Sequence, residues 1–137
     1  MIRRLAAELA DEILLLDPVR PHISPKAKNA PGREVYTLDN KAFICVAFCA
    51  SVPRNEEELL TAWIGSICVP YTVWSLEKGT GRDIIFALRD LLQDTYRVDR
   101  LVTLSPKSDE AKKFHLGLGA KLLRETDWAK NFEYDLA

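Results

Sequence analysis

A short loop with two glycines is the most informative segment of this sequence for ligand binding. Gly79 and Gly81 stand between a strand-like run and the start of a helix-like run. Glycine lets the backbone approach a ligand closely, and a helix start presents unpaired N–H groups and a partial positive charge. This combination suits a pyrophosphate group. The residues that would form such a site are Lys78, Gly79, Thr80, Gly81, Arg82 and Asp83.

The same loop also fits a tight strand-to-helix turn that binds nothing. It lacks the GxxxxGK[ST] spacing of a P-loop and the third glycine of a dinucleotide fingerprint. Lys78 and Arg82 are candidate charge partners for phosphate groups, and they equally fit a solvated turn. Asp83, in the first turn of the helix, would repel a phosphate.

A second segment with candidate chemistry follows further along the chain. Ser108 is suited to cap the start of a helix, and Gly119 is suited to end it. His115 lies in this helix, and a histidine can donate and recover a proton near neutral pH. His115 is therefore a candidate general acid. The alternative is a half-exposed helix residue beside Phe114.

Three further groups of residues could contact a substrate. The acidic run 56–58 could include a base that takes a proton from a substrate, although such a run is usually only solvated. Strand aromatics could line a substrate pocket, although they usually pack in the core. These aromatics are Trp63, Tyr71 and Trp74. His22 lies in a proline-rich loop, and the sequence identifies no partner for it.

The composition describes an ordinary globular domain and argues against several kinds of partner. The chain has 137 residues, of which 47% are hydrophobic and 28% charged, as expected for one domain that folds without metal or disulfide. A net charge of −1 removes the electrostatic case for general nucleic-acid binding. Neither a signal peptide nor an apolar span of membrane length is visible, so we expect a cytoplasmic protein.

The three cysteines are expected to be buried, reduced thiols. A spacing of four puts Cys45 and Cys49 on one face of a strand, about 13 Å apart, which is too far for a disulfide. Cys68 also lies in an apolar run. Zinc would need further ligands, and the two histidines are not at metal-motif spacing, so we expect no metal.

Hydrophobic periodicity predicts the elements around these segments. Apolar residues at steps of three and four predict a core-docked helix from Ile2 to Leu16, followed by a long proline-rich loop over 17–33. Pro70 separates two apolar runs, 59–69 and 71–76, and predicts an edge, a bulge or a break. The other predicted strands are 35–38, 42–50, 101–104, 121–125 and 132–136, and further helices are predicted over 82–95 and after Ser108. This order favours one α/β or α+β domain over residues 1–137, with a single mixed sheet.

The stretch from Trp74 to Arg124 resembles the acyl-CoA-binding core of the GNAT acetyltransferases. The glycine loop is similar to that family's pyrophosphate loop, Gln/Arg-x-x-Gly-x-Gly/Ala. The segment 108–120 is similar to its second signature, Asn-x-x-Ala-x-x-Phe-Tyr-x-x-x-Gly-Phe. The segment 101–104 occupies the place of the strand along which the acyl-CoA arm lies. The resemblance implies a GNAT-like domain with a mostly antiparallel sheet flanked by helices, and an acetyl-CoA site that adds Leu104 and Ser108 to the glycine loop.

Four features depart from the family pattern. Leu76 stands where the family has Gln or Arg, and Ser108 replaces the usual Asn. His115 replaces a Tyr that in many members protonates the departing CoA thiolate, so the resemblance implies a catalytic role for His115. The family's first strand has almost no room before Ile2.

A looser resemblance links the chain to small acetyltransferase-like internal virion proteins of short-tailed phages. These share Val-Trp-x-Leu, here Val73 to Leu76, before a degraded glycine loop. They also share a Phe followed by Gly-Ala, here Phe114, Gly119 and Ala120. This resemblance implies the same fold with unproven catalysis, located in the host cytoplasm or the virion, where protein partners are expected.

Together these patterns predict an acetyl-CoA-dependent N-acetyltransferase whose unidentified amine acceptor attacks the thioester directly. The protein would hold the thioester carbonyl by backbone N–H groups and position the amine. A catalytically inactive GNAT-like structural or interaction protein, such as a phage virion component, is the alternative. A third hypothesis is an acyl-CoA sensor that binds without turnover.

Overall fold

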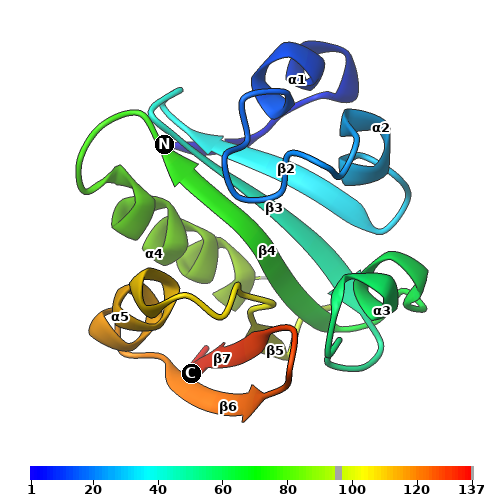
Figure 1. Ribbon diagram of the computed structural model, residues 1–137. Helices are drawn as coiled ribbons and strands as arrows, with labels where there is room; N and C mark the ends of the chain where they lie inside the picture. Colours follow the sequence, from blue (N-terminus) through cyan, green and yellow to red (C-terminus); the bar gives the residue numbers. More distant parts are fainter. Residues whose placement is uncertain (95–96, 137) are drawn as a thin grey trace.

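The computed structural model describes residues 1–94 and 97–136, without the side chains of residues 7–9. Its helices and strands are arranged around one sheet (Figure 1). The strands are β1 (Ile2–Arg4), β2 (Arg33–Leu38), β3 (Ala42–Cys49), β4 (Ile67–Ser75), β5 (Arg100–Val102), β6 (Lys121–Glu125) and β7 (Lys130–Tyr134). The helices are α1 (Ala7–Leu14), α2 (Pro25–Lys28), α3 (Glu56–Thr61), α4 (Thr80–Gln93) and α5 (Asp109–Gly117).

The strands form a sheet with the order β1-β2-β3-β4-β5-β7-β6. Neighbouring strands are antiparallel except β4 and β5, which are parallel. The tight turn between β2 and β3 has Asp39 and Asn40 with φ of 53° and 60°, as their residue types predict. The predicted mixed, mostly antiparallel sheet flanked by helices is confirmed.

Helices cover both faces of the sheet, so there are two cores. The first contains residues of α1 and α3, such as Leu14 and Leu59, and the second contains residues of α4, such as Ile84. Successive residues of β3 alternate between these cores, which explains why its sequence is apolar without interruption. The three cysteines are free and buried, as predicted.

The N-terminal segment differs from the prediction. The expected helix from Ile2 to Leu16 is wrong at both ends, because Ile2–Arg4 form β1 against β2 and α1 stops at Leu14. Leu16 is exposed. The three residues of β1 are too few to show the alternation of apolar and polar residues that is typical of a strand. The predicted helix was therefore extended through them. Leu9 is one of the apolar residues whose spacing predicted this helix, and its side chain lies outside the described residues. Because β1 exists, the first strand of the fold is present after all.

Two short helices lie where no helical period was visible. Ser24 caps α2 by accepting a hydrogen bond from the N–H of Ala27 at 3.1 Å. Asn55 caps α3 by accepting from the N–H of Glu58 at 2.9 Å. Both helices are too short for periodicity, and their N-caps were the available signals.

Pro70 marks a bulge inside one continuous strand, β4. Val46 pairs with Pro70 and Cys45 pairs with Thr72, so Tyr71 is the extra residue. On its other edge, β4 pairs with β5 through Ile67 and Cys68. The N–H of Leu104 then donates to the carbonyl of Pro70 at 2.9 Å. Proline has no N–H to donate to β5, and after this bond the segment that follows β5 departs towards α5 (Figure 1).

Candidate functional site

A cleft of about 330 Å³ lies where β4 and the segment after β5 separate. One wall is β4 from Pro70 to Ser75, and the other is formed by 104–106 together with α5. Gly81, at the start of α4, and Val19, from the loop after α1, complete the lining. Most of this surface is apolar with a few hydroxyl, carboxyl and imidazole groups, which is typical of a small-molecule site.

The two-glycine loop ends at this cleft. Gly79 is the N-cap of α4 with φ of 87°, a conformation that favours glycine. It supplies no side chain to cap the helix. The N–H of Thr80 donates to the carbonyl of Glu77 and that of Asp83 to the carbonyl of Gly79, both at 3.2 Å, so the N–H groups of Gly81 and Arg82 are the ones available to a ligand. A Cβ atom placed on Gly81 would lie 3.7 Å from the ring of Phe114 and 3.9 Å from Oγ of Ser75. Gly81 therefore lies between the two walls, where a larger side chain would enter the cleft.

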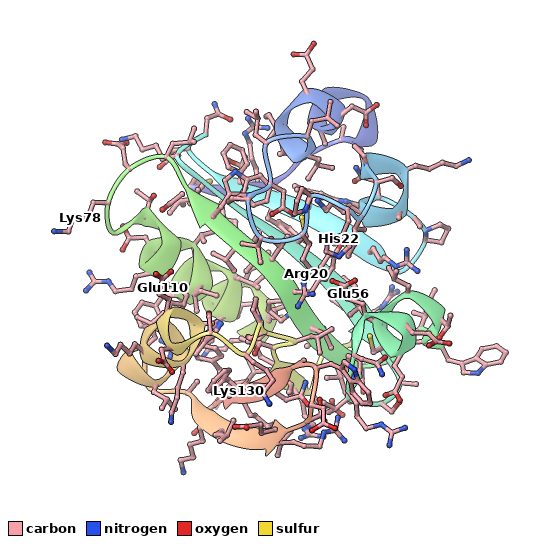
Figure 2. All side chains as sticks on the ribbon, in the orientation of Figure 1. Arg20, His22, Glu56, Lys78, Glu110 and Lys130 are labelled. Carbon is pink, nitrogen blue, oxygen red and sulfur yellow. The ribbon has the colours of Figure 1, made fainter. Side chains whose placement is uncertain are left out.

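The other residues predicted for the loop do not line the cleft. Lys78 is exposed and extends away from the protein (Figure 2). The hydroxyl of Thr80 donates to the carbonyl of Glu77 at 2.7 Å. Arg82 and Asp83 are exposed and face each other, with Nε of Arg82 3.7 Å from Oδ1 of Asp83.

The structure brings Gly81 together with two more of the predicted cofactor residues. Leu104 is buried in the wall after β5. Ser108 lines the cleft and caps α5, because its Oγ accepts from the N–H of Ala111 at 3.2 Å. The predicted N-cap is confirmed, and Gly119 ends the helical segment with φ of 96°, also as predicted.

His115 lines the cleft from α5 but is only 6% exposed. Its ring stacks on Phe132 with centroids 5.2 Å apart, and its Nδ1 lies 2.7 Å from the hydroxyl of Tyr134. Burial lowers the pKa of His115 from its ordinary value of 6.5 to about 4. His115 is therefore neutral near pH 7. A general acid must be protonated, so this burial argues against that role for His115.

A polar cluster lies beside the cleft at the level of the β4 bulge. Arg20 is mostly buried, and its Nε donates to the carbonyl of Tyr71 at 2.7 Å while its Nη2 donates to the carbonyl of Leu104 at 3.0 Å. It thus joins the two cleft walls where they begin to diverge. Its Nη1 contacts Glu56 of α3, and Nε2 of His22 lies 2.7 and 2.8 Å from the two oxygens of the same carboxylate. Figure 2 shows these three side chains close together beside β4.

A buried ion pair between Lys28 and Asp17 holds the backbone of Arg20 in this cluster. Nζ of Lys28 donates to Asp17 at 2.6 Å and to the carbonyl of Arg20 at 3.0 Å. Asp17 also accepts from the hydroxyl of Thr72 on β4 at 2.8 Å. Burial alone would raise the pKa of Asp17, but its hydrogen bonds, first that from Lys28, lower it, so the carboxyl group is ionised.

Several residues of the site have no signal in the sequence. Arg20, Thr72, Ser105 and Glu110 have no motif around them that indicates a site. Of the three aromatics considered for an acceptor pocket, Tyr71 and Trp74 are buried and line the cleft, whereas Trp63 is exposed. Among the described residues, no group of His, Cys, Asp and Glu is arranged to hold a metal ion, and no helix is long and apolar enough to cross a membrane.

Comparison with solved structures identifies the fold. No protein family and no curated protein matches the chain in sequence. The loading GNATL domain of CurA from Lyngbya majuscula is similar with a TM-score of 0.70 and 14% identity, covering 99% of this chain and 97% of that one. The N-acetyltransferase PseH of Campylobacter jejuni, solved with acetyl coenzyme A, is similar with a TM-score of 0.63 and 12% identity, and each chain is covered completely. The chain has the GNAT fold.

Malonyl-CoA decarboxylases are also similar. The Agrobacterium vitis protein gives a TM-score of 0.61 at 20% identity, over 77% of this chain. This chain spans 33% of the length of that decarboxylase. At identities of 12–20%, these TM-scores show a shared fold and no more. The resemblance to phage virion proteins stays a prediction.

Proposed function

We propose that the cleft binds an acyl-CoA thioester and that the protein transfers its acyl group to an amine. The observation that carries this proposal is the separation of β4 from β5 into a lined cleft that ends at the two-glycine start of α4. The pyrophosphate would lie at the N–H groups of the first turn of α4. The acyl arm would then run along β4 towards Pro70. The fold that this chain shares with PseH, which was solved with acetyl coenzyme A, supports the assignment.

The chain offers backbone and side-chain groups for the thioester. Beyond Pro70, the edge of β4 that faces the cleft is not paired with β5, so its peptide groups can bind a pantetheine arm. His115 fits the role of a neutral donor better than that of an acid. If the hydroxyl of Tyr134 donates to Nδ1, the proton of the imidazole is on Nε2, where it can polarise a carbonyl.

Calorimetric titration with acetyl-CoA and with CoA tests the cofactor site. Gly81→Glu adds bulk and negative charge between the cleft walls and should abolish binding without unfolding the domain. Gly117→Glu is the matched control, because a Cβ at Gly117 meets nothing within 4 Å and Gly117 does not line the cleft. Equal affinity of Gly81→Glu and the parent would place the site elsewhere. If the parent binds neither ligand, the non-enzymatic alternative is favoured.

A second reaction, decarboxylation of a malonyl-type thioester, is favoured by one observation. Malonyl-CoA decarboxylases share this fold, and decarboxylation needs no acceptor. Loss of CO₂ leaves a carbanion delocalised onto the thioester oxygen, which N–H donors in the cleft would stabilise, and a proton from solvent on that carbon then gives acetyl-CoA. Incubation with malonyl-CoA and mass spectrometry distinguishes the two reactions. Formation of acetyl-CoA without any amine supports decarboxylation, and unchanged malonyl-CoA excludes it.

A further inference from the structure

The pair of His22 and Glu56 has the arrangement of a base with its positioning carboxylate. Nε2 of His22 lies within hydrogen-bond distance of both carboxylate oxygens of Glu56, at 2.7 and 2.8 Å. A carboxylate only accepts, so the proton of a neutral His22 is held on Nε2. The lone pair of Nδ1 then remains available, and no hydrogen bond to Nδ1 is present among the described residues.

The carboxylate in this pair is held firmly. Burial alone would raise the pKa of Glu56, but hydrogen bonds from His22 and then from Arg20 lower it, so it is ionised. Arg20 is itself fixed by the carbonyls of Tyr71 and Leu104, at 2.7 and 3.0 Å. An ordinary surface ion pair lacks such an anchor and is mobile. One guanidinium group therefore links Glu56 to both walls of the cleft.

This cluster also lies in a suitable place for an acceptor. Tyr71 and Leu104 mark the part of the cleft far along β4 from the glycine loop, where the acyl end of a bound thioester would lie. The side chain of His22 is 59% exposed, so an incoming molecule can reach it. Arg20 and Glu56 contribute opposite charges beside it.

We propose that His22 is the general base that accepts the proton of the acceptor amine, that Glu56 orients it, and that Arg20 anchors Glu56 to the cleft. This inference rests on the acyl transfer proposed above. The amine nitrogen forms a bond to the thioester carbonyl carbon, and Nδ1 of His22 takes the N–H proton. The C–S bond then breaks, and CoA leaves as a thiolate that is protonated by solvent. His22 returns its proton to solvent.

Steady-state kinetics of variants test the assignment. The probes are acetyl-CoA and a panel of primary amines comprising lysine peptides, polyamines and amino sugars, from which the fastest acceptor is used. His22→Gln should lower kcat/KM by about 10²–10⁴-fold while the calorimetric Kd for acetyl-CoA stays unchanged. Lys26→Gln, an exposed change a short distance along the chain, should alter neither quantity. Added imidazole should restore part of the activity of His22→Ala, which a purely structural role would not allow.

The positioning role of Glu56 has its own readout. Glu56→Gln keeps an acceptor for the N–H of His22, whereas Glu56→Ala removes it, so activity should fall in the order parent, Glu56→Gln, Glu56→Ala. Unchanged kcat/KM in His22→Gln, with normal acetyl-CoA binding, would overturn this inference and leave acyl transfer standing. A parent protein that binds acetyl-CoA but acetylates none of the panel would overturn both.

Discussion

The two histidines of this chain have opposite surroundings and therefore suit different chemistry. His115 is enclosed by aromatic rings, with Phe114 and Phe132 at centroid distances of 5.0 and 5.2 Å. His22 is exposed and contacts the carboxylate of Glu56. Burial disfavours the protonated form of the His115 imidazole, whereas the exposed His22 imidazole has a carboxylate partner and can be reached by a substrate.

We predict that the imidazole of His115 titrates near pH 4 and that its protonation lowers the free energy of unfolding in acid. Its folded pKa is lowered from 6.5 to about 4, so the unfolded state binds the proton first as the pH falls. The contribution of this lowered pKa to the free energy of unfolding is present in full above pH 6.5 and is lost as the pH falls towards 4. This shift corresponds to about 3 kcal/mol at most. NMR titration of the imidazole and urea unfolding over this pH range measure both effects.

The difference between the parent and His115→Phe isolates this contribution, because acidic groups also titrate in the same range. The free energy of unfolding of His115→Phe should depend less steeply on pH between 6.5 and 4. An imidazole of His115 that titrates near 6.5 would contradict the prediction.

In α1, packing against the sheet determines which apolar residues of the predicted helix are buried. Leu14, at the end of the helix, is 1% exposed and belongs to the first core. Leu15, the next residue, is 70% exposed. The helix is thus docked over the sheet through one face, and it precedes the loop that carries Arg20 and His22.

We predict that Leu14→Ala lowers the free energy of unfolding by about 2–5 kcal/mol, because it leaves a cavity in the core. Leu15→Ala is the matched control and should change it by less than about 0.5 kcal/mol. Urea denaturation of both variants provides the measurement. A loss below about 0.5 kcal/mol for Leu14→Ala would show that α1 does not pack on the sheet.

For the whole molecule, the central sheet separates two cores and each contains cysteine. Cys45 and Cys49 belong to the first core and Cys68 to the second. Burial raises the pKa of all three thiols, that of Cys49 to about 11. The thiolate is the reactive form, so folding suppresses reactivity both by exclusion of reagent and by the raised pKa.

We therefore predict that a thiol reagent labels almost none of the cysteines at neutral pH in the folded protein. All three should react after denaturation in guanidinium chloride, which serves as the control for reagent and protein. Mass spectrometry of the labelled protein counts the modified groups. Rapid labelling of three cysteines without denaturant would mean that the cores are open.

The sequence by itself determined the features that depend on local spacing. These include the helix after the glycine loop, the cap at Ser108, the turn at Asp39 and an irregularity at Pro70, for which the sequence allowed an edge, a bulge or a break. Each depends on a residue type with a defined backbone preference or on an amphipathic pattern several turns long. The same reasoning extended α1 through β1, since a three-residue strand has too few residues to reveal its period.

Only the tertiary structure decided what the site contains. Arg20 and Leu104 are 84 positions apart, and His22 and Glu56 are 34 apart. Their contacts depend on the order of strands in the sheet and on the point where β5 leaves β4. The burial that makes His115 neutral comes from Phe132 and Tyr134 on β7. Contacts between distant segments carry no local signal, so the chemistry of a side chain becomes defined only when folding sets its neighbours and its exposure to water.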